Sequence, residues 1–156
     1  LYRIHDLANS INKSNLELTI LYPFFDENYK NELFLLLKNK YYDLGRLSRN
    51  DMYKVLFESK VVFSVPISDS SPRSVYESIF CGAIVIITYQ KYYDELPLCM
   101  KRRIIVVNLE NENFLEVALN ELTQRLEEVY IPSKQAIEMF DQKITFLELS
   151  KKLYQI

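Results

Sequence analysis

The stretch from Ser64 to Thr88, SVPISDSSPRSVYESIFCGAIVIIT, holds the pattern that decides the fold. It begins at the end of an apolar strand, continues through a polar loop into a short helix, stops at Gly82 and ends in a second apolar strand. Ligands of open parallel sheets bind outside the carboxyl ends of the strands. The loop also leads into a helix N-terminus, where free backbone amides and the helix dipole attract phosphate. This order of elements therefore predicts a ligand site.

The helix inside this stretch has a well-defined start and end. Ser70 or Ser71 is a suitable N-cap, and Pro72 fits the first helical position, where no amide hydrogen is needed. Gly82 can adopt the left-handed conformation that ends a helix, because it has no Cβ atom. The next strand can then begin immediately after it.

Polar and charged side chains of this helix share one stripe. Arg73 and Ser74 precede Glu77 by four and three positions, so the three side chains lie on one face. Asp69, in the loop, precedes Glu77 by eight positions. We expect the two carboxylates to face a common cleft, next to the amides at the helix start.

The rest of the chain alternates between strand and helix patterns. The expected strands are 17–22, 41–44, 61–65, 83–87 and 103–107. The further helices that we expect are 3–13, 28–38, 48–59, 111–128 and 133–154, with a turn or short helix at 94–100. Three of the strands are apolar enough for burial on both faces, which is typical of parallel strands joined by right-handed crossovers. We therefore predict an α/β fold, a Rossmann-like parallel sheet with helices on both faces.

The composition supports one globular domain. The chain has 156 residues, of which 49% are hydrophobic, and this is enough for a sizeable core. No apolar run reaches the roughly 18 to 20 residues that are needed to cross a bilayer. The formal net charge of −2, with both signs interspersed, gives no basic stripe for a nucleic-acid backbone. We therefore expect no nucleic-acid partner.

The two cysteines indicate a reducing environment. Cys81 and Cys99 lack the spacing of metal ligands and lie among apolar residues. Two reduced, buried thiols are favoured over a disulfide, and reduced thiols are typical of cytoplasmic proteins. No cluster of candidate ligands points to a metal. We therefore expect a cytoplasmic location, no metal site and no cofactor.

The region 69–86 resembles the donor-binding half of glycosyltransferases of the GT-B fold, especially the large retaining family 4. That family carries two acidic residues eight positions apart, usually both Glu, followed by Cys-Gly or a similar pair and an apolar strand. Asp69 and Glu77 match the spacing, and CGAIVI at 81–86 matches the continuation. One branch of the family has Asp first, then small residues and Pro, much like 69–72 here.

The resemblance extends from about Leu16 to the C-terminus, and its specific motifs lie between Leu44 and Thr88. It implies that residues 1–156 form a single nucleotide-sugar-binding domain, the C-terminal half of a GT-B fold. We expect an excised domain, because the chain starts at Leu1 and the family's N-terminal acceptor domain is absent.

The resemblance gives each of the two carboxylates a role. Glu77 would accept hydrogen bonds from the vicinal ribose hydroxyls of a nucleotide-sugar. The alternative is a surface pair with Arg73, four positions away. Asp69 would be the catalytic residue beside the transferred sugar, where it would bond a hydroxyl or stabilise positive charge at the anomeric carbon. Its alternative is a loop aspartate that caps the helix.

The diphosphate or the sugar would be met by four residues near the helix start, Ser70, Ser71, Arg73 and Ser74. The family also uses an Arg and a Lys from a glycine-containing loop after its first strand. Only two glycines occur in this sequence, so it holds no Gly-rich phosphate loop. We therefore expect part of the donor site to be missing and the affinity for the donor to be weak.

Gly45, Arg46, Leu47 and Ser48, followed by Met52 and Tyr53, resemble the family's segment beside the nucleotide base. In that segment a backbone turn reads the base edge and a following helix packs below it. The alternative is an ordinary strand-to-helix turn, in which Gly45 supplies permissive dihedral angles.

The implied function is a donor domain that binds a nucleotide-diphosphate sugar for transfer of a hexosyl group to a glycan or a lipid-linked acceptor. The isolated domain would be inactive, since the missing N-terminal domain would bring the acceptor. Peripheral association of the full-length protein with the inner face of the membrane is left open.

Two alternatives remain: a catalytically silent nucleotide-binding or interaction domain of the same fold, and a receiver-like signalling module. The signalling module would need acidic residues grouped after its first strand, and no such group is evident.

Overall fold

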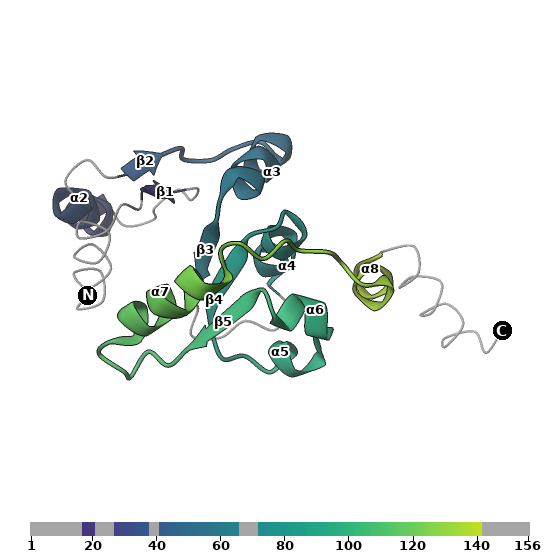
Figure 1. Cartoon of the computed structure of the whole chain (residues 1–156). Helices are drawn as coiled ribbons and strands as arrows, with labels where there is room; N and C mark the ends of the chain where they lie inside the picture. The colour runs from purple at the N-terminus through teal and green to yellow at the C-terminus, as the bar shows by residue number, and fades with distance from the viewer. Residues whose placement is uncertain (1–16, 21–26, 38–40, 66–71, 142–156) are drawn as a thin grey trace.

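The computed structural model describes residues 17–20, 27–37, 41–65 and 72–141. Strands and helices alternate along these residues (Figure 1). The strands are β1 (Leu18–Ile20), β2 (Tyr41–Asp43), β3 (Val61–Ser64), β4 (Ile84–Thr88) and β5 (Ile104–Val107). The helices are α2 (Glu27–Leu37), α3 (Arg49–Glu58), α4 (Arg73–Phe80), α5 (Tyr92–Glu95), α6 (Leu98–Lys101), α7 (Phe114–Arg125) and α8 (Lys134–Phe140).

The described strands pair in parallel, as predicted. The larger sheet has three strands in the order β3-β4-β5, with Val61 opposite Ile84 and Ile86 opposite Ile105. The smaller sheet has two strands, β1 and β2, with Leu18 opposite Tyr41. Within the described residues the strands thus form two parallel sheets, since neither β1 nor β2 pairs with β3.

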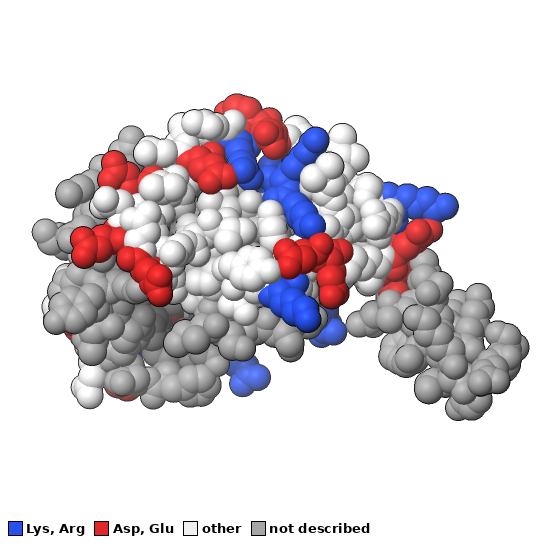
Figure 2. All heavy atoms as spheres, turned by 90° about the horizontal axis from the view of Figure 1, so that it is seen from below, with Lys and Arg blue, Asp and Glu red and all other residues white. Residues whose placement is uncertain are grey.

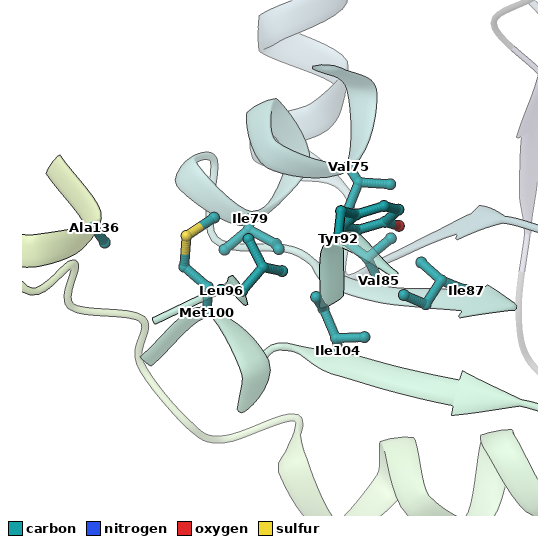
Figure 3. Packing of buried hydrophobic residues seen from close by; sticks show 9 residues of the cluster. All are labelled: Val75, Ile79, Val85, Ile87, Tyr92, Leu96, Met100, Ile104 and Ala136. Carbon is teal, nitrogen blue, oxygen red and sulfur yellow. The ribbon is translucent and has the colours of Figure 1, made fainter. Parts of the chain in front are cut away.

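Strand β4 lies at the centre of the core and is buried on both faces. Ile84 and Ile86 pack into a cluster with residues of α7, whereas Val85 and Ile87 pack on the other side with residues of α4, α5 and α6. The second cluster comprises Val75, Ile79, Val85, Ile87, Tyr92, Leu96, Met100, Ile104 and Ala136 (Figure 3). Helices therefore cover both faces of the larger sheet, which confirms the Rossmann-like α/β fold.

The smaller sheet has a core of its own. Leu33 and Leu37 of α2 are buried, and Leu18 and Ile20 of β1 pack against them. These leucines lie four positions apart on the helix, so they present one apolar face to the two strands.

The buried Arg103 links two turns of the chain. Its guanidinium group donates hydrogen bonds to the carbonyl of Gly82, in the turn before β4, and to the carbonyl of Glu128 at 2.8 Å, after α7. Burial lowers the pKa of Arg103, and the two carbonyls partly offset the cost of burying its charge. The α4–β4 turn and the segment after α7 are therefore held together.

Two predicted helices differ in extent. Helix α7 begins at Phe114 rather than near residue 111, because the side chains of Asn108 and Asn111 accept hydrogen bonds from backbone amides two positions further on. Helix α8 ends at Phe140, and Asp141 is extended with a ψ angle of 111°. The rest of the predicted 133–154 helix lies outside the described residues, as does the predicted helix 3–13.

The segment 94–100 contains two short helices rather than one, since α5 and α6 are separated by Leu96 and Pro97. Cys81 and Cys99 are free thiols, as predicted, and both are partly rather than fully buried. No helix of the described residues is long and apolar enough to cross a membrane.

We expect replacement of Ile86 by Ala to lower the free energy of unfolding by about 2 to 5 kcal/mol, because the fully buried side chain would leave a cavity. Urea denaturation followed by circular dichroism would measure the loss. Val117→Ala is the control, since that side chain is 53% exposed on α7 and should change the free energy by less than about 0.5 kcal/mol. Equal losses in the two variants would contradict the central position of β4.

Candidate functional site

Helix α4 begins one residue later than predicted. Pro72, and not Ser70 or Ser71, takes the N-cap position, with φ −74° and ψ 98°. A proline suits this position because only its carbonyl is needed, and that carbonyl accepts hydrogen bonds from the amides of Val75 and Tyr76 at 3.0 and 3.4 Å. No side-chain hydrogen bond caps this end of the helix. Of the amides in its first turn, those of Val75 and Tyr76 are thus used, and no described residue accepts from those of Arg73 and Ser74.

The two faces of α4 differ as the sequence predicts. Val75 and Ile79 are buried in the core, whereas Arg73 and Ser74 are exposed. Glu77 lies between these extremes, with 16% of its side chain exposed. The helix therefore presents a partly buried carboxylate on the side that faces away from the sheet.

Helix α3 has the start that its sequence predicts. The Ser48 side chain accepts a hydrogen bond from the Asp51 amide at 3.2 Å and donates one to the Asp51 carboxylate at 2.7 Å. Such reciprocal bonds define the first turn of a helix. The neighbouring residue, Arg49, is therefore held in a fixed position at the start of α3.

The turn between β2 and α3 places Gly45 in the left-handed region, with φ 56°. Its amide donates to the Asp43 carboxylate at 3.0 Å, and the other Asp43 oxygen pairs with Lys30 at 3.2 Å. Gly45 thus supplies permissive dihedral angles, as the structural alternative predicts. Leu47 is partly buried and Arg46 is exposed, and the role of this turn in reading a nucleotide base stays a prediction.

Glu77 is hydrogen-bonded to two residues of α3. Its Oε1 atom accepts from the Arg49 guanidinium at 2.9 Å and from the Tyr53 hydroxyl at 2.8 Å. The Arg49 Nε atom also donates to the Tyr53 hydroxyl oxygen at 2.9 Å. The surface pair of Glu77 with Arg73 was the wrong alternative, because the carboxylate points to α3 and its ionic partner is Arg49.

These contacts bring together two segments that lie 28 residues apart in the sequence. The start of α3, which directly follows the Gly45 turn, lies against the middle of α4. The segment predicted to lie beside the base is thus a neighbour of Glu77, the residue predicted to bind the ribose. The hydrogen bonds of Tyr53 and Glu77 also raise the pKa of Arg49, which remains a cation beside the carboxylate.

Arg49 and Tyr53 were not among the predicted site residues. Tyr53 belongs to the segment that resembles the family's base-binding segment, and the spacing of four positions places Arg49 and Tyr53 on one stripe of a predicted helix. Neither residue is near Glu77 in sequence, so the contact requires the packing of α3 on α4.

Three predicted site residues, Asp69, Ser70 and Ser71, lie outside the described residues. The structure therefore does not test the pairing of Asp69 with Glu77 or the catalytic role of Asp69. Within the described part of the chain, no group of three or more His, Cys, Asp or Glu side chains could hold a metal ion.

The described surface carries charges of both signs. Figure 2 shows Lys and Arg side chains beside Asp and Glu side chains on one face, with no continuous basic area there. This distribution agrees with the small formal net charge of −2.

Comparisons with known proteins show similarity in structure. No protein-family model matches the sequence, and no curated protein matches it. The structure is similar to that of AviGT4, a glycosyltransferase involved in avilamycin A biosynthesis, with a TM-score of 0.65 and 16% sequence identity. The match covers 97% of this chain and 46% of the AviGT4 chain, so this chain spans about half of that protein. At this identity the likeness shows the fold.

We expect replacement of Ser48 by Ala to lower the free energy of unfolding by about 1 kcal/mol, because the cap of α3 would be lost. Urea denaturation would measure the change. Asn50→Ala is the matched control, since Asn50 is exposed on the same turn and should alter the free energy by less than about 0.5 kcal/mol. A Ser48 variant as stable as the control would show that the cap does not hold the start of α3.

Proposed function

We propose that this chain is the C-terminal, donor-binding domain of a GT-B glycosyltransferase of the family 4 type. It would bind a nucleotide-diphosphate sugar, from which the enzyme transfers a hexosyl group to a glycan or a lipid-linked acceptor. Transfer requires a second, N-terminal domain that brings the acceptor, and the isolated domain is inactive. The family resemblance implies retention of configuration at the anomeric carbon.

The observation that carries this proposal is the position of Glu77. Its side chain is 16% exposed, lies on a helix that follows a strand of the larger parallel sheet, and contacts the helix that follows the Gly45 turn. Ligands of open α/β sheets bind in such places, outside the carboxyl ends of the strands. A carboxylate accepts hydrogen bonds from two neighbouring hydroxyls, and ribose offers such a pair.

The start of α4 suits the diphosphate. Its first amides lack a side-chain cap, and the helix dipole favours negative charge at this end. The exposed Arg73 would add positive charge beside these amides. Asp69, in the loop before this helix, would then lie near the sugar and stabilise positive charge at the anomeric carbon. Catalysis of this kind depends on positioning and on stabilisation of the leaving diphosphate.

The likeness to AviGT4 supports the proposal at the level of the fold. Folds of this class carry many functions, so the carboxylate and the helix start make the proposal specific. A cytoplasmic location is part of it, since the donor would be a cytoplasmic nucleotide-sugar and both cysteines are free thiols.

A second candidate is a catalytically silent domain of the same fold. One observation favours it: Arg49, the basic side chain bonded to Glu77, already pairs with that carboxylate instead of being free for a phosphate. The sequence also lacks a Gly-rich phosphate loop. Such a domain would keep the interaction surfaces of the fold without binding a donor.

Calorimetric titration with UDP, GDP and ADP would separate the two candidates. We expect the protein to bind one of these nucleotides, and Glu77→Ala to weaken that binding by about 10- to 100-fold. The loss of hydrogen bonds to a charged group has this magnitude.

Glu116→Ala is the control for this titration, because Glu116 is exposed on α7, away from α4. Its affinity should equal that of the unmodified protein. If the folded, unmodified protein binds none of the three nucleotides, the silent domain replaces the enzyme as the conclusion.

A further inference from the structure

The cluster of Arg49, Tyr53 and Glu77 is closed, because each member is bonded to the other two. Arg49 donates to Tyr53 and to Glu77, and Tyr53 donates to Glu77, over distances of 2.8 to 2.9 Å. The Arg49 guanidinium also lies 5.6 Å from the centre of the Tyr53 ring. Hydrogen bonds in such a network strengthen one another, and together they restrict the orientation of each group.

Both donors bind the same carboxylate oxygen. The Arg49 and Tyr53 hydrogen bonds end on Oε1 of Glu77, and no described residue donates to Oε2. A carboxylate oxygen can accept about two hydrogen bonds, so the described donors fill Oε1 and leave Oε2 without a bond to any described residue. The cluster thus fixes the carboxylate with Oε1 towards α3, and the hydrogen-bonding capacity of Oε2 is not used by any described residue.

Fastening α3 to α4 does not by itself account for this arrangement. The Arg49 side chain is 61% exposed, and ion pairs with exposed partners contribute little to stability. Leu56 of α3 and Val75 of α4 already lie in the core, where apolar burial stabilises the packing of these helices. The cluster adds orientation of one carboxylate, which a binding site requires.

We propose that Tyr53 and Arg49 are positioning residues that hold Glu77 for recognition of a vicinal diol. This inference rests on the proposed function, and it specifies the ligand: a ribonucleoside diphosphate group whose ribose hydroxyls donate to Oε2 of Glu77. A 2′-deoxynucleotide lacks one of these donors. The cluster therefore makes the site selective for ribonucleotides, although neither Tyr53 nor Arg49 touches the ribose.

The test measures whether these residues act through the ribose hydroxyl. The nucleoside diphosphate that binds is titrated beside its 2′-deoxy form against the unmodified protein, Tyr53→Phe and Arg49→Gln. We expect the unmodified protein to bind the ribonucleotide about 3- to 10-fold more tightly than the deoxynucleotide, as one hydrogen bond allows. In both variants this preference should fall towards unity, while the affinity for the deoxynucleotide stays the same.

Two controls make the result specific. Tyr42→Phe removes the hydroxyl of a tyrosine that is 56% exposed on β2, and it should keep the full ribose preference. Circular dichroism of each variant shows whether the fold is intact. Arg49 is mostly exposed, so Arg49→Gln remains informative if Tyr53→Phe fails to fold.

The outcomes separate the inference from the proposed function. If the unmodified protein binds no nucleoside diphosphate, the proposed function fails and the positioning role fails with it. If it binds but the variants weaken both nucleotides equally, or weaken neither, the proposed function stands and the positioning role is overturned.

Discussion

The burial of β4 on both faces is the constraint on which the rest of the structure depends. Its side chains alternate between two apolar clusters, one under α7 and one under α4 and its neighbours. Its backbone is hydrogen-bonded on both sides, since the Ile84 amide donates to the carbonyl of Lys60 and the Val85 amide donates to the carbonyl of Arg103. The strand can therefore shift in neither direction without exposing apolar residues. Because Gly82 joins β4 to α4 with φ 95°, the position of Glu77 follows from the position of this strand.

Most of the fold could be predicted from the sequence because its signals are local. The apolar runs around Val62, Val85 and Ile105 identify buried strands, and Ser48 and Gly82 define a helix start and a helix end. The errors in helix boundaries come from local hydrogen bonds, which hydrophobic periodicity does not reveal. The start of α7, for example, is delayed by asparagine side chains that accept from backbone amides. The division of the described strands into two sheets was not predictable, since it depends on pairing between distant segments.

The site was also predictable only in part, because some of its signals are local and others depend on distant segments. Glu77 stands out because its helix has a clear apolar stripe and its carboxylate lies off that stripe. Its partners do not stand out, because Tyr53 and Arg49 are 24 and 28 residues away. The rule for neighbours on one helix offered Arg73 as the alternative partner. That rule holds for isolated helices, and here the packing of a second helix supplied two better donors.

A partly buried carboxylate loses hydration, and its partners must offset that loss. Tyr53 and Arg49 do so at one oxygen of Glu77, whose side chain is 16% exposed. Replacing such a cluster by apolar residues is often neutral or stabilising, so stability gives little reason for charged groups between α3 and α4. What an apolar contact could not supply is an oriented acceptor with free lone pairs. In the function that we propose, this oriented acceptor binds the ligand, and the burial of β4 keeps α4 in place.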